Sequence, residues 1–506
     1  MATRLISIPP ETVPRFDELY AISDLHLGGL PGFQIFDAGA ELVRLVEHLR
    51  SRAAERQVAL VINGDLVDFL AERPATYFDP EGAVQKLDRI ATREAFEGVF
   101  KALRKFAGTK NCSLAITLGN HDLELALPWV REHLLGLLSR GNEAARGRIT
   151  LAFDGAGFRC RVGEATVLCV HGNEVDLWNV ADHERIRRIG QDAQRGRAVA
   201  PWIPNAGTQL VIDAMNEIKS RFPFVDLLKP EAQAVVPTLL ALAPDQRDRI
   251  AALTATVRRL TWDRVRRATG FLGDEQEDGV VGATTASAFP ARTAPSTGVT
   301  EMVLPERDRR SYADALLEQT ERRLAAEVEP LALIANDARG EYLGIGAAVG
   351  RMVRGQSRPE VLREALQELK KDRSFDPTTE DQTFRDLDQE VGAGVDFLLT
   401  GHTHLERALP RKQARGHYFN SGTWVRLIRL EDKLLDSSGE FAKAYEAFEK
   451  GTMQALDEFP GLVVRRRGMV AIRSDESGTH GQLLNVSVGA DRQVLLEDRS
   501  PRFMAR

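Results

Sequence analysis

Short apolar runs that alternate with amphipathic segments constrain the fold of this chain more than any other feature. Three such runs lie near the start, at 18–26, 57–65 and 112–120, and each is almost continuously apolar. Runs of this length are typical of strands that are buried on both faces of a parallel sheet. Between them, Leu, Val and Phe recur every three or four residues at 38–55 and 82–107, which predicts helices. The resulting β-α-β-α-β order implies parallel pairing with right-handed crossovers.

Later segments extend this pattern and then interrupt it. "FRCRVG" and "ATVLCVHG" predict a hairpin around Gly163 and Glu164, and strand-like character returns at 395–404 and 417–428. "GLVVRRRGMVAIRS" and "QLLNVSVGADRQVLLE" are two further strand candidates that close the sequence. Residues from about 180 to 393 are instead almost wholly helical in pattern. The simplest interpretation is one α/β domain that is interrupted by a helical insertion.

The overall composition excludes several classes of protein. The 506 residues carry a net charge of −6, so the chain as a whole has no signature of polyanion binding. Its three cysteines, Cys112, Cys160 and Cys169, have no CxxC spacing, which favours buried thiols in a reducing compartment. No window approaches 18 uninterrupted apolar residues, and the first residues lack the apolar region of a secretory signal. We therefore expect a cytoplasmic protein, with peripheral contact to the inner face of the membrane left open.

Five of the expected strands end in side chains that commonly bind metals. They are Asp24 and His26 in "SDLHLGG", Asp65 in "NGDLVDFL", Asn120 with His121 in "GNHD", His171 in "VHGNE", and His402 and His404 in "TGHTH". Functional groups gather at the carboxyl ends of strands in open α/β sheets. A donor set of carboxylate, imidazole and amide oxygen without thiolate suits Mn, Fe or Zn. We expect two divalent metal ions, with Mn²⁺ favoured, and two ions about 3.5–4 Å apart form a template for phosphoryl displacement.

In this order, the motifs D-x-H, GD-x-x-D, GNHD, H-G and GH-x-H resemble the calcineurin-like metallophosphoesterase superfamily over about 18–180 and 394–428. The resemblance implies a four-layer αββα sandwich with a large, mostly helical insertion. It also implies that a hydroxide bridging the two metals attacks phosphorus. The first metal would take Asp24, His26, Asp65 and His404, and the second would take Asp65, Asn120, His171 and His402. His121 would act beside the leaving group as a general acid or electrostatic clamp, oriented by Asp122.

The motifs also bear on the substrate. Protein phosphatases of the superfamily follow GD-x-x-D with an arginine that grips the phosphate, whereas this chain has Phe69. "SDLHLGG", "HGNE", "TGHTH" and "NSGTW" are similar to the branch that contains UDP-2,3-diacylglucosamine hydrolase. We therefore expect a phosphodiesterase or a pyrophosphate-cleaving enzyme, and a lipid-linked substrate fits this branch. A nuclease acting on DNA or RNA, a phosphomonoesterase and a protein-binding scaffold remain alternatives, and the oligomeric state is left open.

The order of motifs predicts a divided domain. Its predicted parts are a core segment at 1–180, a helical insertion at 181–393 with a mobile loop at about 274–301, and a second core segment at 394–506. The insertion is expected to cap or flank the metal site, because a predicted ligand precedes it and two others follow it. Within it, an Arg-rich helical pattern at 247–269 is read as a solvated face. The alternatives for that pattern are contact with a phosphate-rich substrate, an anionic membrane surface or nucleic acid.

Overall fold

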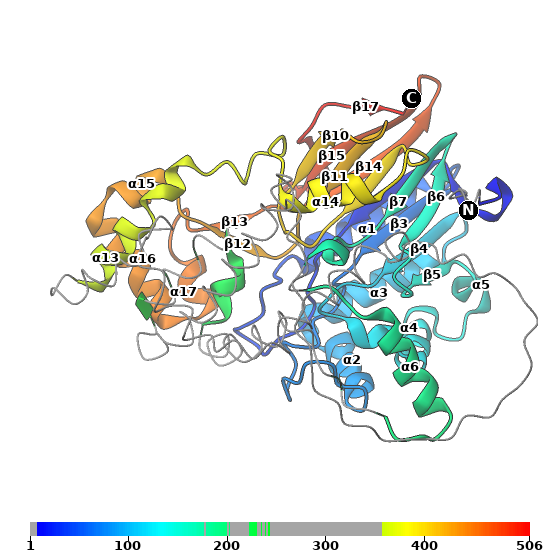
Figure 1. Cartoon of the computed structure of the whole chain (residues 1–506), viewed down its shortest axis with the longest axis horizontal. Coiled ribbons are helices and arrows are strands. Elements are labelled where there is room, and N and C mark those ends of the chain that lie inside the picture. Colours follow the sequence, from blue (N-terminus) through cyan, green and yellow to red (C-terminus); the bar gives the residue numbers. More distant parts are fainter. Residues whose placement is uncertain are drawn as a thin grey trace, which may run out of the picture.

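Two facing β-sheets form the centre of the molecule (Figure 1). The structure is a computed structural model, and it describes residues 8–176, 179–199, 202, 222–229, 234, 238, 241–242 and 357–505. The predicted mobile loop at 274–301 and the Arg-rich helix at 247–269 lie outside the described residues. Most of the predicted insertion does so as well.

The larger sheet has the strand order β16-β15-β14-β2-β3-β4-β5, and β17 pairs with β15. Its strands are β2 (Glu18–Ile22), β3 (Val58–Asn63), β4 (Cys112–Thr117), β5 (Ile149–Ala152), β14 (Gly468–Asp475), β15 (Gly478–Val488), β16 (Val494–Asp498) and β17 (Phe503–Met504). Strands β2 to β5 are parallel, as the apolar runs predict. In register, Ile22 pairs with Ile62 and Ile62 with Ile116. The carboxyl ends of these three strands therefore lie level with one another.

The smaller sheet has the strand order β1-β6-β7-β9-β11-β10. Its strands are β1 (Arg15–Phe16), β6 (Phe158–Val162), β7 (Ala165–Cys169), β9 (Phe397–Thr400), β10 (Arg407–Pro410) and β11 (His417–Asn420). The hairpin of β6 and β7 is confirmed. The single strand expected at 417–428 is wrong, because the chain leaves β11 and turns at Gly422, where φ is 73°. It then forms β12 (Arg426–Arg429) in a different sheet.

Helices cover the outer faces of both sheets and complete a four-layer αββα sandwich. The helices α1 (Gly39–Arg52), α2 (Ala83–Thr92), α3 (Glu94–Gly108), α4 (Pro128–Ser139) and α5 (Glu143–Arg146) belong to the larger sheet's side, and α14 (Gln382–Glu390) covers the smaller sheet. Leu19 and Val61 of one sheet share a buried apolar cluster with Phe397 and Phe419 of the other. The predicted fold class is confirmed.

Three predicted elements divide where the sequence suggested continuity. The helix expected at 82–107 is two helices, because Arg93 adopts an extended conformation with ψ of 133°. Each closing strand candidate also divides. The first gives β13 (Val463–Arg465) and β14, and the second gives β15 and β16, which are joined by a turn with Arg492 at φ of 64°.

A smaller lobe lies beside the sandwich (Figure 1). Its sheet has the order β13-β12-β8, where β8 is Leu228–Lys229. The lobe's helices are α13 (Arg358–Ala365), α15 (Asp432–Asp436), α16 (Ser438–Lys450), α17 (Met453–Asp457) and the 3₁₀ turns η4 (Pro223–Leu227) and η7 (Gln367–Lys371). The lobe thus combines residues from before 393 and after it, and the domain boundaries stay a prediction. Among the described residues, no helix has the length and apolar character to cross a membrane.

Candidate metal centre

The predicted ligands come together where strands of both sheets end. Asp24, Asp65 and His121 follow β2, β3 and β4 of the larger sheet. From the smaller sheet, His171 follows β7, and His402 and His404 follow β9. Because the core strands of the sandwich end at the same side, all of these residues except His402 join His26 in overlapping clusters whose ligand atoms lie within 4.8 Å of one another. The clusters are Asp24, His26 and His404; His26, Asp65 and His121; and Asp24, Asp65 and His171.

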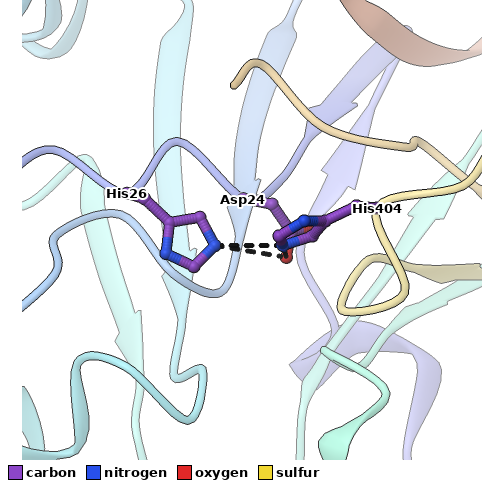
Figure 2. Close-up of side chains that lie close together, drawn as sticks. All are labelled: Asp24, His26 and His404. Atoms are coloured by element: carbon purple, nitrogen blue, oxygen red, sulfur yellow. Dashed lines mark hydrogen bonds and ion pairs between the residues drawn. The ribbon is translucent and has the colours of Figure 1, made fainter. Parts of the chain in front are cut away.

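One half of the centre lies around Asp24. Figure 2 shows the side chains of Asp24, His26 and His404 pointing toward one another. His404 Nε2 lies 3.3 Å from Asp24 Oδ1 and 3.1 Å from His26 Nε2. Asp24 is fully buried and His26 is 2% exposed, so these polar groups are withdrawn from water. Three donors with converging atoms could hold one cation.

The other half lies around Asp65, whose carboxylate is close to both His26 and His171. Asp65 Oδ2 is 3.2 Å from His171 Nε2 and 3.6 Å from His26 Nε2. Its second oxygen, Oδ1, accepts a hydrogen bond of 2.9 Å from the backbone N–H of His121. His171 is held in place because its Nδ1 lies 2.8 Å from the Asn63 carbonyl oxygen, so Nε2 faces the carboxylate. Asp65 therefore belongs to two of the three clusters.

The backbone at the centre is held in an uncommon conformation. Five of the predicted ligands have positive φ: Asp24 (54°), His26 (45°), Asp65 (51°), His402 (70°) and His404 (61°). Residues other than glycine seldom adopt this left-handed region, and each instance costs on the order of 1–3 kcal/mol. Such strain persists where the surrounding structure fixes it, and it gathers at functional sites.

His402 and Asn120 are close to these clusters but differ in their contacts. The backbone N–H of His402 donates to Asp24 Oδ2 at 3.0 Å, while its ring Nε2 lies 2.8 Å from Asp176 Oδ2. Asn120 Nδ2 donates to Asn179 Oδ1 at 3.4 Å. Asn120 Oδ1 is buried and has no hydrogen-bond partner within the described part of the chain. A buried amide oxygen without a partner is costly, and a cation would satisfy it.

The expectation that Asp122 orients His121 is wrong. The Asp122 carboxylate instead accepts hydrogen bonds from the backbone N–H groups of Gly119 (2.7 Å) and Leu66 (2.8 Å). Asp68 takes the expected role, because its Oδ2 lies 3.1 Å from His121 Nδ1 and 3.3 Å from His26 Nδ1.

Asp68 and Asp176 also contact predicted site histidines, His121 and His402, and neither was predicted as a site residue. The GD-x-x-D spacing contained a signal for Asp68. No sequence signal pointed to Asp176.

The electrostatics of the centre favour positive charge. Burial would raise the pKa of Asp24, but the hydrogen bond and charge of His404 lower it to about 2. Burial also opposes ionisation of Asp65, yet His171, His121 and His26 hold its pKa well below its usual range. Burial would lower the pKa of His171, but Asp65 and Asp24 raise it to about 10. Two ionised, buried carboxylates therefore attract protons or metal cations to the same place.

Two facing sheets with a buried cluster of carboxylates and imidazoles define an α/β protein with a candidate metal centre. Residues 18–223 match the family model described as calcineurin-like phosphoesterase. Its members are hydrolases that act on phosphoester bonds with divalent metals. No curated protein and no solved structure matches the chain. His402 and His404 lie beyond the matched segment, and the structure brings His404 to the matched Asp24.

Proposed function

We propose that this chain hydrolyses phosphodiester or pyrophosphate bonds with a binuclear metal centre. The observation that carries the proposal is the buried cluster in which Asp65 lies between two groups of ligand atoms. We assign one metal to Asp24, His26, Asp65 and His404. We assign the other to Asp65, Asn120, His171 and His402.

The donor set fits divalent cations of the first transition row. Oxygen and imidazole donors without thiolate suit Mn, Fe or Zn, and we favour Mn²⁺. The unsatisfied Asn120 Oδ1 and the ionised carboxylates Asp24 and Asp65 are the groups that a cation would stabilise. When bound, two such ions lower the pKa of water and neutralise the oxygens of a phosphoryl group.

His121 is the proposed group that assists the leaving oxygen. Its side chain is 21% exposed, whereas His26 beside it is almost fully buried. The Asp68 carboxylate fixes the ring through Nδ1, and Asp68 stays ionised because His121 and His26 outweigh the effect of burial on its pKa. We assign proton donation, or stabilisation of the leaving oxygen, to Nε2 of His121.

A diester or pyrophosphate is favoured over a phosphoprotein. Phe69 occupies the position after GD-x-x-D, and it is fully buried with its backbone N–H bonded to the His121 carbonyl oxygen at 3.2 Å. It therefore offers no cation to grip a terminal phosphate. The motif likeness to the branch of UDP-2,3-diacylglucosamine hydrolase points the same way.

Hydrolysis of two model esters tests the proposal. Bis-p-nitrophenyl phosphate and p-nitrophenyl phosphate are compared with added Mn²⁺, for the wild type and for His121→Ala. We expect the wild type to prefer the diester and His121→Ala to lose most of that rate, about 10²-fold or more. Cleavage of the monoester alone would contradict the diesterase assignment.

A further inference from the structure

One fully buried amide joins the two facing sheets directly beside the candidate metal centre. Asn63 is the last residue of β3 and is 0% exposed, and Asp65 follows it by two positions. Its side chain is not among the proposed metal ligands. A buried amide is costly unless its polar atoms are hydrogen-bonded, so the partners of Asn63 indicate what this side chain does.

The Asn63 side chain donates hydrogen bonds across the space between the sheets. Its Nδ2 donates to the carbonyl oxygens of Val170 at 2.8 Å and of Leu399 at 3.1 Å. Val170 follows β7 and directly precedes His171. Leu399 lies in β9, three residues before His402. One amide of the larger sheet therefore holds the two strand ends of the smaller sheet that lead to predicted ligands.

A neighbouring hydroxyl fixes the orientation of this amide. Thr117 ends β4 and is the register partner of Asn63. Its Oγ1 donates to Asn63 Oδ1 at 2.9 Å, so both hydrogens of Nδ2 are left for the facing sheet. The backbone of Asn63 takes part as well, because its carbonyl oxygen accepts a hydrogen bond of 2.8 Å from His171 Nδ1. Asn63 is thus bonded to residues of β4, β7 and β9 or to the loops that follow them.

The rest of this face of β3 is apolar. Ala59 and Val61 lie four and two residues before Asn63 on the same face, and both belong to the buried cluster between the sheets. Phe397 and Leu399 contribute to that cluster from β9. Apolar contacts are non-directional, so they hold the sheets together without fixing their relative position. The hydrogen bonds of Asn63 are directional and can fix it.

The relative position of the sheets matters because each proposed metal takes ligands from both. The ligands after strands of the larger sheet are Asp24, His26, Asp65 and Asn120, and those after strands of the smaller sheet are His171, His402 and His404. A shift of one sheet against the other would therefore separate the donors of both metals. The two sets of ligands meet at Asp65, whose Oδ2 lies 3.2 Å from His171 Nε2.

We propose that Asn63 is a positioning residue that holds the two sheets where the ligands of both can reach the metals. This inference rests on the proposed function, because it concerns the same centre, and it adds a residue that does not itself bind metal. The second metal depends on Asn63 most directly, since the partners of the amide lead to His171 and His402. Replacing a side chain that holds metal ligands in this indirect way changes metal affinity about 10–100-fold.

Two substitutions that each replace a buried amide by an apolar side chain test this role. Asn63→Leu removes the amide between the sheets. Gln482→Met is the control, because Gln482 is 4% exposed and donates to the Ser500 carbonyl oxygen at 3.2 Å. Chelator-treated protein is titrated with Mn²⁺ by calorimetry, and its unfolding by denaturant is followed separately. We expect Asn63→Leu to weaken Mn²⁺ binding about tenfold or more, and Gln482→Met to leave it within about twofold.

A purely structural role of Asn63 predicts a different result. Both variants would then lose stability, while Asn63→Leu would bind Mn²⁺ as tightly as the wild type or lose no more affinity than Gln482→Met. Either finding would overturn the proposal.

Thr117→Val keeps the test decisive if Asn63→Leu does not fold. It removes only the hydroxyl that orients the amide and leaves Asn63 in place. We expect it to weaken Mn²⁺ binding about threefold, as the loss of one hydrogen bond would. Unchanged Mn²⁺ binding by a folded Thr117→Val would overturn the positioning role.

Hydrolysis of bis-p-nitrophenyl phosphate by the same samples separates this inference from the proposed function. A wild type that binds Mn²⁺ without hydrolysing the ester would refute the proposed function, and the binding data would still decide the role of Asn63. A wild type that binds no Mn²⁺ would refute both.

Discussion

Asp68 shows how a single carboxylate can organise two imidazoles. It lies within 3.3 Å of ring nitrogens of both His26 and His121, and its other oxygen accepts the backbone N–H of Ala71 at 2.9 Å. The ring positions of a proposed metal ligand and of the proposed acid therefore depend on one side chain. Outer partners of this kind fix ring orientation and tautomer.

We predict that Asp68→Asn acts mainly through His121. With saturating Mn²⁺, kcat for bis-p-nitrophenyl phosphate should fall about 10–100-fold. Adding Asp68→Asn to His121→Ala should cause little further loss, because residues that act as a unit are not additive. Steady-state kinetics of the two single variants and the double variant measure this, and fully multiplicative losses would contradict the assignment.

Glu124 gives a prediction about stability and pH. It is buried, and its Oε1 accepts the backbone N–H of Asp79 at 2.7 Å. Burial raises its pKa to about 7, against the lowering effects of that hydrogen bond and of Lys86. The folded protein then binds a proton more tightly than the unfolded chain. Stability from this group is complete below pH 4.5 and is lost as the pH rises through about 7.

We expect Glu124→Gln to remove this part of the pH dependence. The amide keeps the acceptor for Asp79 and cannot ionise. Between about pH 4.5 and 7 the wild type should lose about 3 kcal/mol of unfolding free energy relative to the variant. Denaturant unfolding at several pH values measures the difference, and parallel profiles for the two proteins would show the prediction to be wrong.

The sequence predicts a residue of the candidate metal centre where that residue belongs to a recognisable motif. The D-x-H and GH-x-H spacings identified Asp24, His26 and His404, which the structure brings together. The Asp122 prediction failed because the sequence neighbours His121 and Asp122 direct their side chains to different partners, and the partner of His121 comes from another strand end. Contacts between distant strand ends leave no local pattern.

The boundaries of helices and strands depend on contacts with residues outside the helix or strand itself. The apolar spacing at 82–107 continues through Arg93, so nothing local predicts a break there. Arg93 Nη1 donates to the Gly29 carbonyl oxygen at 2.8 Å and forms an ion pair with the buried Glu72. These contacts hold the chain where α2 ends and α3 begins. By contrast, the parallel strands were predicted because full burial requires a continuous apolar run.

The loop after β4 depends on Gly119. A Cβ at this position would lie against the Asp65 carboxylate and 2.5 Å from the Asp65 backbone N. We predict that Gly119→Ala displaces Asp65, lowers the bound metal and reduces diester hydrolysis more than tenfold. Metal analysis and kinetics on purified protein check this. Gly108→Ala is the control, because a Cβ there meets nothing within 4 Å, and equal behaviour of both variants would contradict the reading.

At the scale of the whole molecule, an arginine joins the lobe to the sandwich. Arg426 of β12 forms ion pairs with Asp37 at 3.3 Å and with Asp457 at the end of α17 at 3.0 Å. It also donates to the Gln34 carbonyl oxygen at 2.8 Å. Its side chain is 11% exposed, so these contacts are largely shielded from water.

We predict that Arg426→Met lowers the free energy of unfolding by about 2–4 kcal/mol, because it removes the more buried of the two arginines that pair with Asp37 and Asp457. Denaturant unfolding measures the change. Arg44→Met serves as the comparison, since Arg44 forms an exposed pair with Glu47 and should change stability by less than about 1 kcal/mol. Similar losses in both variants would argue against a specific role for Arg426.

The arrangement of the smaller lobe could not be predicted from the sequence. The alternation of strands and helices predicted the sandwich, but not that β12 leaves it to pair with β8. That pairing joins residues about 200 positions apart in the chain. It places Ile428 opposite Leu228 and Arg429 opposite Lys229.

Metal content and turnover, measured on the same samples, test whether Asp65 holds the metals that hydrolysis requires. Wild type and Asp65→Asn are loaded with Mn²⁺, freed of excess ion, and analysed for metal and for hydrolysis of bis-p-nitrophenyl phosphate. Asp154→Asn, at an exposed turn, controls for loss of one carboxylate. We predict about two ions per chain and diester cleavage for wild type and Asp154→Asn, and loss of both for Asp65→Asn. Unchanged metal content and activity in Asp65→Asn would show that Asp65 does not hold a metal that hydrolysis requires.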